Sequence, residues 1–111
     1  MFNQGEIVLI PVPFTDLSAS KRRPVLIVSN NNYNAAKHDI IVAAITSNLT
    51  QAGIPITNND MISGQIPKPS VVRSDKIYTL DQRIVVKPIG SVSKAVQEAV
   101  KMEIARLIDL I

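Results

Sequence analysis

Short apolar, β-branched runs alternate with turn-forming stretches over most of the chain, and this pattern predicts a series of short strands. The clear runs cover residues 7–10, 25–28 and 40–45, and weaker candidates cover 54–57, 71–78 and 84–86. The run at 40–45 is too continuous for a strand with one face in solvent, so we expect a core strand there. Predicted turns cover 15–23, 30–34, 58–60 and 64–69.

The pattern changes after Ser93, where apolar residues begin to recur three or four positions apart. The recurring residues are Val96, Val100, Ile104, Leu107, Ile108 and Ile111. This spacing puts them on one face of a helix that runs to the end of the chain, with Ser93 as its N-cap. About six strands and one terminal amphipathic helix predict an α+β, mainly β fold, in which a small barrel or curled antiparallel sheet carries the helix.

Length and composition limit what this fold can do. With 111 residues the chain is predicted to be a single domain over residues 1–111, too short for a separate cofactor-binding domain. No apolar run approaches the ~18 residues of a membrane-spanning helix, and the first residues show no secretory signal. The chain has no cysteine, which excludes disulfides and thiolate metal sites. We therefore expect a cytoplasmic protein with no membrane partner.

The charged residues narrow the chemistry further. Twelve Lys and Arg against nine Asp and Glu give a net charge of +3, which is compatible with a polyanionic partner without requiring one. His38 is the only histidine, which excludes a nuclease that uses two catalytic histidines. It is followed directly by Asp39, and we expect the two to form a surface pair rather than part of a catalytic site. We expect neither a metal nor a cofactor, so catalysis would use Arg, Lys, Ser, Thr, Tyr or isolated carboxylates.

The strongest candidate site is the basic run that enters the strand at 25–28. Lys21, Arg22 and Arg23 follow Ser18 and Ser20, and together they form a predicted phosphate clamp. Guanidinium groups pair with phosphate oxygens through two parallel hydrogen bonds, and lysine adds a compact charge. From composition alone, however, such a run is more commonly a solvated surface loop.

A second candidate is Thr46-Ser47-Asn48, at the end of the predicted core strand. Hydroxyl and amide groups at a strand end can donate hydrogen bonds to an oxyanion. They can equally cap the following turn, which is the commoner role of these residue types.

The order of these features along the chain resembles the MazF/PemK family of bacterial toxins. The matching segments are Gly5-Glu6-Ile7-Val8, Arg23-Pro24-Val25, Ala44-Ile45-Thr46-Ser47 and residues 70–80, followed by the terminal helix. The resemblance covers nearly the whole chain, and its specificity comes from the order and spacing of motifs that are individually weak.

The resemblance implies an SH3-like small barrel that acts as a homodimer and is neutralised by a cognate antitoxin protein. It also implies metal-independent cleavage of single-stranded RNA, with mRNA as the expected class. Arg23 and Thr46 take the positions of the family's catalytic residues. Many members carry a Gly-Ser-Glu-Gln-type loop before the arginine, whereas here the acidic helper is absent and Ser18 or Ser20 is the nearest polar substitute.

The remaining predicted substrate contacts come from both halves of the chain. The predicted RNA-binding residues are Ser18, Ser20, Lys21, Arg22, Ser47, Lys76 and Tyr78. Lys68 and Arg73 could line the same groove, and Tyr78 could stack on a base. The alternative is that these residues are exposed strand charges beside a half-buried tyrosine.

Two other functions remain open: a CcdB-type, non-enzymatic poison of DNA gyrase, and a non-catalytic nucleic-acid-binding module. Retention of both Arg23 and Thr46 favours the nuclease over the gyrase poison, which does not need a phosphate-activating pair. An aromatic content of only 4% argues against the binding module, because such modules more often interleave aromatic and basic residues.

Overall fold

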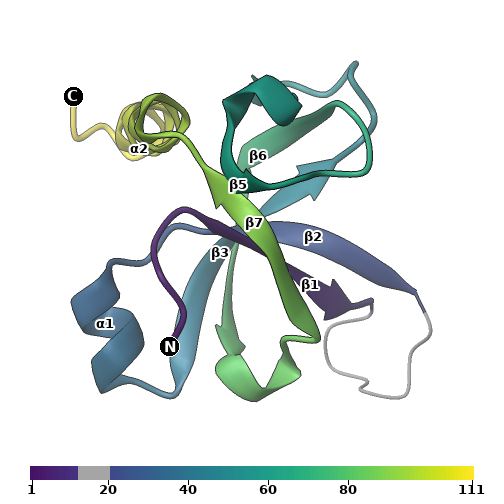
Figure 1. Cartoon of the computed structure of the whole chain (residues 1–111). Helices are drawn as coiled ribbons and strands as arrows, with labels where there is room; N and C mark the ends of the chain where they lie inside the picture. The colour runs from purple at the N-terminus through teal and green to yellow at the C-terminus, as the bar shows by residue number, and fades with distance from the viewer. Residues whose placement is uncertain (13–20) are drawn as a thin grey trace.

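The computed structural model describes residues 1–12 and 21–111, and within them seven strands form one curled antiparallel sheet (Figure 1). The strands are β1 (Glu6–Pro11), β2 (Arg22–Ile27), β3 (Asp39–Thr46), β4 (Ile54–Ile56), β5 (Met61–Gly64), β6 (Ser70–Asp81) and β7 (Lys87–Val92). Their order across the sheet is β4-β6-β3-β2-β1-β7-β5. The mainly β fold with a C-terminal helix is therefore confirmed.

Both faces of the central strands are buried, which explains why their sequences are continuously apolar. Along β3, Ala43 and Ile45 belong to one buried cluster, whereas Val42 belongs to a second cluster on the opposite face. Successive side chains of a strand point to opposite faces of the sheet. Because each face of β3 packs into a buried cluster, every position of the 40–45 run has to be apolar. The expectation that 40–45 is a core strand is confirmed.

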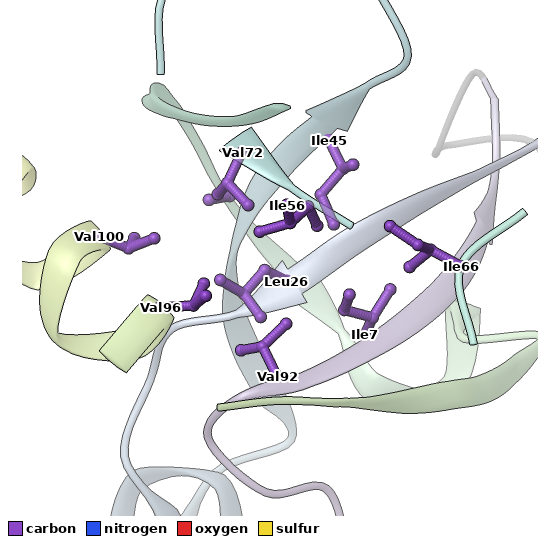
Figure 2. Close-up of a cluster of buried hydrophobic side chains, with 10 residues drawn as sticks. Ile7, Leu26, Ile45, Ile56, Ile66, Val72, Val92, Val96 and Val100 are labelled. Atoms are coloured by element: carbon purple, nitrogen blue, oxygen red, sulfur yellow. The ribbon is translucent and has the colours of Figure 1, made fainter. Parts of the chain in front are cut away.

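The first buried cluster holds the C-terminal helix on the sheet. Helix α2 (Lys94–Leu107) places Val96 and Val100 against this cluster, and Figure 2 shows both side chains reaching toward Leu26. The Ser93 hydroxyl accepts a hydrogen bond from the Val96 N–H at 3.3 Å, which confirms the predicted N-cap. None of the helices in the described part of the chain is long and apolar enough to cross a membrane.

The helix ends at Leu107, earlier than the apolar spacing predicts. Asp109 adopts a positive φ of 59°, and the Leu110 N–H donates to the Ala105 carbonyl at 2.8 Å. The Asp109 N–H donates to the Arg106 carbonyl at 3.2 Å, so the two bonds form a Schellman-type cap that satisfies the last carbonyl groups. Ile108 and Ile111 lie beyond the helix and are exposed, and so is Leu107 at its last position, so the predicted buried face does not extend to these three residues.

Three elements differ from the sequence prediction. The strand expected at 84–86 is wrong: Gln82–Ile84 is a short 3₁₀ helix capped by Asp81, and β7 begins only at Lys87. Part of the turn expected at 30–34 is instead helix α1 (Asn31–Ala36), whose first turn is capped by the Asn30 side chain. Strand β5 was not predicted at all, because its four residues show no regular alternation.

Strand β5 depends on glycine at its contact with β7. Gly64 pairs with Gly90, and a Cβ on Gly64 would lie 2.0 Å from the Ile89 carbonyl oxygen. Gly64 also has a φ of +67°, a conformation that other residues rarely adopt. Close backbone approach, rather than side-chain pattern, therefore forms this edge of the sheet.

Removal of the α2 cap gives a direct test of the helix start. We expect Ser93→Ala to lower the free energy of unfolding by about 1 kcal/mol, because the Val96 N–H loses its acceptor. Urea denaturation measures this loss, and Ser93→Asp, which keeps an acceptor oxygen, is the matched control. Equal midpoints for the alanine variant and the parent protein would show that the cap contributes nothing.

Candidate active site

Arg23 and Thr46 lie at the same end of the β2–β3 pair. Arg23 is opposite Ile10 of β1, and Val25 is opposite Ala44 of β3. The β2–β3 pairing ends at Val25 and Ala44, so Arg23 and Thr46, the last residue of β3, each lie two residues beyond the final pair, at the same end of the two strands. The two predicted catalytic residues therefore lie near the same end of neighbouring strands, although the ladder does not pair them directly.

Beside them is a cleft of about 260 Å³ that we call the cationic cleft. It is lined by Lys21, Arg22, Arg23, Pro24, Ile45, Ser47, Pro67, Lys68 and Ser70. Its four cations come from two separate segments, the start of β2 and the β5–β6 connection. Lys68 stands between two prolines, whose fixed φ angles restrict the backbone that presents it.

The cationic cleft carries positive charge that the described carboxylates do not neutralise. In residues 1–12 and 21–111 the ion pairs are Arg73–Asp75, Arg83–Asp81 and Lys101–Glu98. None of these pairs includes a cation of the cleft. All four cleft cations are exposed, so the cleft presents donors and positive potential to an anion from solution.

A second cleft of about 340 Å³ adjoins the first, and we call it the apolar cleft. It is lined by Ile10, Val12, Arg23, Pro24, Val25, Ala44, Ile45 and Tyr78. Arg23, Pro24 and Ile45 line both clefts and therefore form their common boundary. Sequence reasoning missed this cleft, although the alternate residues Ile10 and Val12 already indicated a shared apolar face.

The Thr46 hydroxyl takes part in the turn that follows β3. It accepts a hydrogen bond from the Asn48 N–H at 3.1 Å, so the turn-capping role considered from the sequence is present. Within the described residues no hydrogen bond uses this hydroxyl as a donor, which leaves its proton for a ligand. Thr46 is half-buried and does not line either cleft itself, whereas its neighbour Ser47 lines the cationic cleft.

Arg73 is held in a surface polar network and lines neither cleft. Its Nε and Nη2 donate to the two oxygens of Asp75 at 3.0 and 2.9 Å, and its Nη1 donates to Gln51 Oε1 at 2.7 Å. The hydrogen-bonded Arg73 guanidinium lowers the pKa of Asp75. Arg73 lies in β6, opposite Ala44 of β3. Because it also donates to Gln51, the network connects β6 to the loop that follows the Thr46 turn.

The other predicted contacts are distributed unevenly. Lys76 is exposed in the irregular part of β6 where pairing with β3 shifts register, and it lines neither cleft. Ser18 and Ser20 lie outside the described residues. His38 is exposed, and the described ion pairs do not include the expected contact with Asp39.

The site combines groups suited to phosphoryl chemistry. A guanidinium with a neighbouring hydroxyl can donate hydrogen bonds to phosphate oxygens, and the adjoining cations can hold further phosphates of a polyanion. Within residues 1–12 and 21–111, no three His, Cys, Asp or Glu side chains are grouped so that they could hold a metal ion.

Known proteins resemble the chain over almost its full length. Two mycobacterial proteins, "Endoribonuclease MazF6" of Mycobacterium tuberculosis and "Endoribonuclease MazF2" of Mycobacterium bovis, are each 33% identical over 95 residues, which cover 82% of both chains.

Solved structures share the fold. A mycobacterial endoribonuclease in complex with its cognate antitoxin has a TM-score of 0.74 at 23% identity and covers 100% of this chain and 98% of its own. MazF of Deinococcus radiodurans has a TM-score of 0.73 at 19% identity and covers 97% and 96% of the two chains. Residues 3–108 also match the family described as the PemK-like, MazF-like toxin of type II toxin-antitoxin systems. With a family match over nearly all of its residues and curated relatives at one-third identity, the chain belongs to the PemK-like, MazF-like toxins.

Proposed function

We propose that residues 1–111 form one toxin domain that cleaves single-stranded RNA, with mRNA as the expected target in the cytoplasm. The observation that carries this proposal is the cationic cleft, which Arg23 lines at the end of the β2–β3 pair where Thr46 also lies. Relatives support the proposal, because proteins that are 33% identical to this chain are named endoribonucleases. Cleavage of mRNA would stop translation and growth, which is how such a toxin would act.

The proposed reaction is an internal phosphoryl transfer that needs no metal ion. The ribose 2′-oxygen forms a bond to the adjacent phosphorus as its proton is removed, and the bond from phosphorus to the 5′-oxygen breaks. That oxygen takes up a proton, so the products are a 2′,3′-cyclic phosphate and a 5′-hydroxyl. Arg23 stabilises the negative charge that develops on the phosphorane oxygens, and Thr46 donates a hydrogen bond to the same oxygens.

Incubation of the purified protein with a long RNA in EDTA, followed by mapping of the ends, tests the proposal. We expect cuts at a limited set of sequences, each leaving a cyclic phosphate and a 5′-hydroxyl. Bound but intact RNA would indicate a binding module. Intact RNA together with inhibition of DNA gyrase would indicate a gyrase poison, and either outcome would overturn the proposed activity.

We expect the protein to be a homodimer. The C-terminal segment exposes large apolar side chains, with Leu110 at 72% and Ile108 at 68%, and a symmetric partner would cover such a surface. Light scattering at micromolar concentration should give twice the 12.1 kDa mass of one chain. A monomer at that concentration would contradict the prediction.

A cognate antitoxin should bind across the 15–23 loop, of which Lys21, Arg22 and Arg23 are described. Structures related to this chain contain such complexes, including MazE–MazF of Deinococcus radiodurans. An acidic segment that folds on binding would complement the exposed cations. We expect Lys21→Glu with Arg22→Glu to weaken the complex at least about tenfold in calorimetry.

The matched control for this charge reversal is Lys37→Glu with Lys94→Glu, which changes net charge equally at exposed positions away from the clefts. The control variant should bind the antitoxin almost normally. Equal weakening by both double variants would mean that overall charge, rather than this loop, determines the affinity.

A further inference from the structure

We infer that the apolar cleft holds one nucleobase of the RNA strand, next to the phosphate bound at Arg23. This inference rests on the proposed function and assigns the part of the substrate that the cationic cleft leaves unplaced. The sequence suggested only that Tyr78 could stack on a base. The structure supplies a shaped cavity, with walls from β1, β2, β3 and β6.

The two clefts are arranged as a nucleotide requires. The cationic cleft offers donors to phosphates, and the apolar cleft begins where it ends, at Arg23, Pro24 and Ile45. A nucleotide has a charged backbone and a flat, largely apolar base that projects from it. A strand whose phosphate contacts Arg23 can therefore direct its base into the apolar cleft without leaving the cationic one.

The lining of the apolar cleft matches the faces of a base. Ile10 and Val25 form part of its wall and belong to the second buried cluster, with only 3% and 4% of their surfaces exposed, so this wall is preformed. Tyr78 contributes an aromatic ring, on which bases of any identity can stack. A volume of about 340 Å³ is within the range of small-molecule sites and is ample for one base.

A second copy of the chain is the other occupant that this apolar surface could attract. Arg23 argues against it, because a protein partner seated on the cleft would bury a guanidinium that has no described carboxylate beside it. An RNA strand supplies both groups: its phosphate is the anion for Arg23, and its base fills the apolar cleft. The positive charge of Arg23, at the common boundary of the two clefts, therefore favours a nucleotide over a second copy of the chain as the occupant of the apolar cleft.

An abasic scan combined with Ala44→Leu tests the inference. Ala44 lines the cleft, and a leucine there would take up space that the base needs. For the parent protein, removal of the base at one position beside the cut should raise KM about tenfold, the scale of one lost stacking contact. Ala44→Leu should raise KM about tenfold on intact RNA and cause no further loss on RNA abasic at that position.

Ala36→Leu, at an exposed position on α1, is the matched control and should behave as the parent protein on every substrate. The inference is overturned if no abasic position raises KM, or if Ala44→Leu impairs intact and abasic RNA equally. It is also overturned if Ala44→Leu shifts the sedimentation of the RNA-free protein toward monomer, since a second copy would then be the occupant.

Tyr78 provides an independent test if Ala44→Leu does not fold. Tyr78→Leu should raise KM about tenfold on intact RNA only, whereas Tyr78→Phe, which keeps the ring, should raise KM much less. Equal KM values for both variants would overturn the stacking contact. If the parent protein does not cleave RNA at all, the proposed function has failed, a result distinct from cleavage that is insensitive to base removal.

Discussion

Arg23→Ala lowers the rate of RNA cleavage by roughly 10²–10³-fold, the scale of removing one donor to a developing oxyanion. The loss should appear in kcat, because the charge that Arg23 stabilises builds up only in the transition state. The folded dimer should persist, since Arg23 is exposed and its side chain makes no ion pair with the described residues. Single-turnover cleavage of a short RNA measures the effect directly.

Two neighbouring substitutions show whether the effect is specific to Arg23. Arg23→Lys should not restore full activity, because an ammonium group cannot reproduce the planar two-point contact of a guanidinium. Lys21→Ala should instead weaken RNA binding and make it less dependent on salt, with less effect on the chemical step. Full activity in a folded Arg23→Ala dimer would refute the catalytic assignment.

Thr46→Val should lower kcat by about 10²-fold, since it removes the hydroxyl that donates to the phosphorane but keeps the β-branched shape. The variant should keep its place at the end of β3, because valine favours extended backbone as threonine does. Cleavage rate and urea denaturation measured on the same preparation separate catalysis from folding.

The alternative role of Thr46 predicts a different pair of results. Its hydroxyl accepts the Asn48 N–H, so as a turn cap alone it would lose only about 1 kcal/mol of stability in Thr46→Val, with cleavage unchanged. Thr46→Ser keeps a hydroxyl and is the matched control for both roles. An unimpaired Thr46→Val enzyme would leave Thr46 as a turn residue.

Much of the fold follows from local sequence. The apolar runs at 7–10 and 40–45 lie in β1 and β3, the run at 25–28 lies in β2 except for Val28, and Ser93 caps α2 as predicted. These elements were predictable because their periodicity and capping depend on residues a few positions apart. The order of motifs along the chain also indicated the correct toxin family, and that order alone identified Arg23 and Thr46 as candidates.

Elements that depend on distant contacts were missed or misplaced. Strand β5 exists because the backbone at Gly64 approaches Gly90, and β7 starts later than predicted because Asp81 caps a 3₁₀ helix first. The early end of α2 follows from the conformation of Asp109, which apolar spacing cannot reveal. In each case a backbone hydrogen bond or a close approach prevails over the pattern of side chains.

The sequence by itself therefore determined the family and the central strands and indicated candidate catalytic residues, because those properties lie in short stretches of chain. Only the tertiary structure decided how the residues assemble. The β2–β3 pairing brings Arg23 and Thr46 to the same end of the two strands, and the β5–β6 connection brings Lys68 to the cationic cleft. Strands β1, β2, β3 and β6 together form the apolar cleft beside Arg23. Cross-strand pairing and sheet curvature join residues that are far apart in the chain, and no local pattern specifies that geometry.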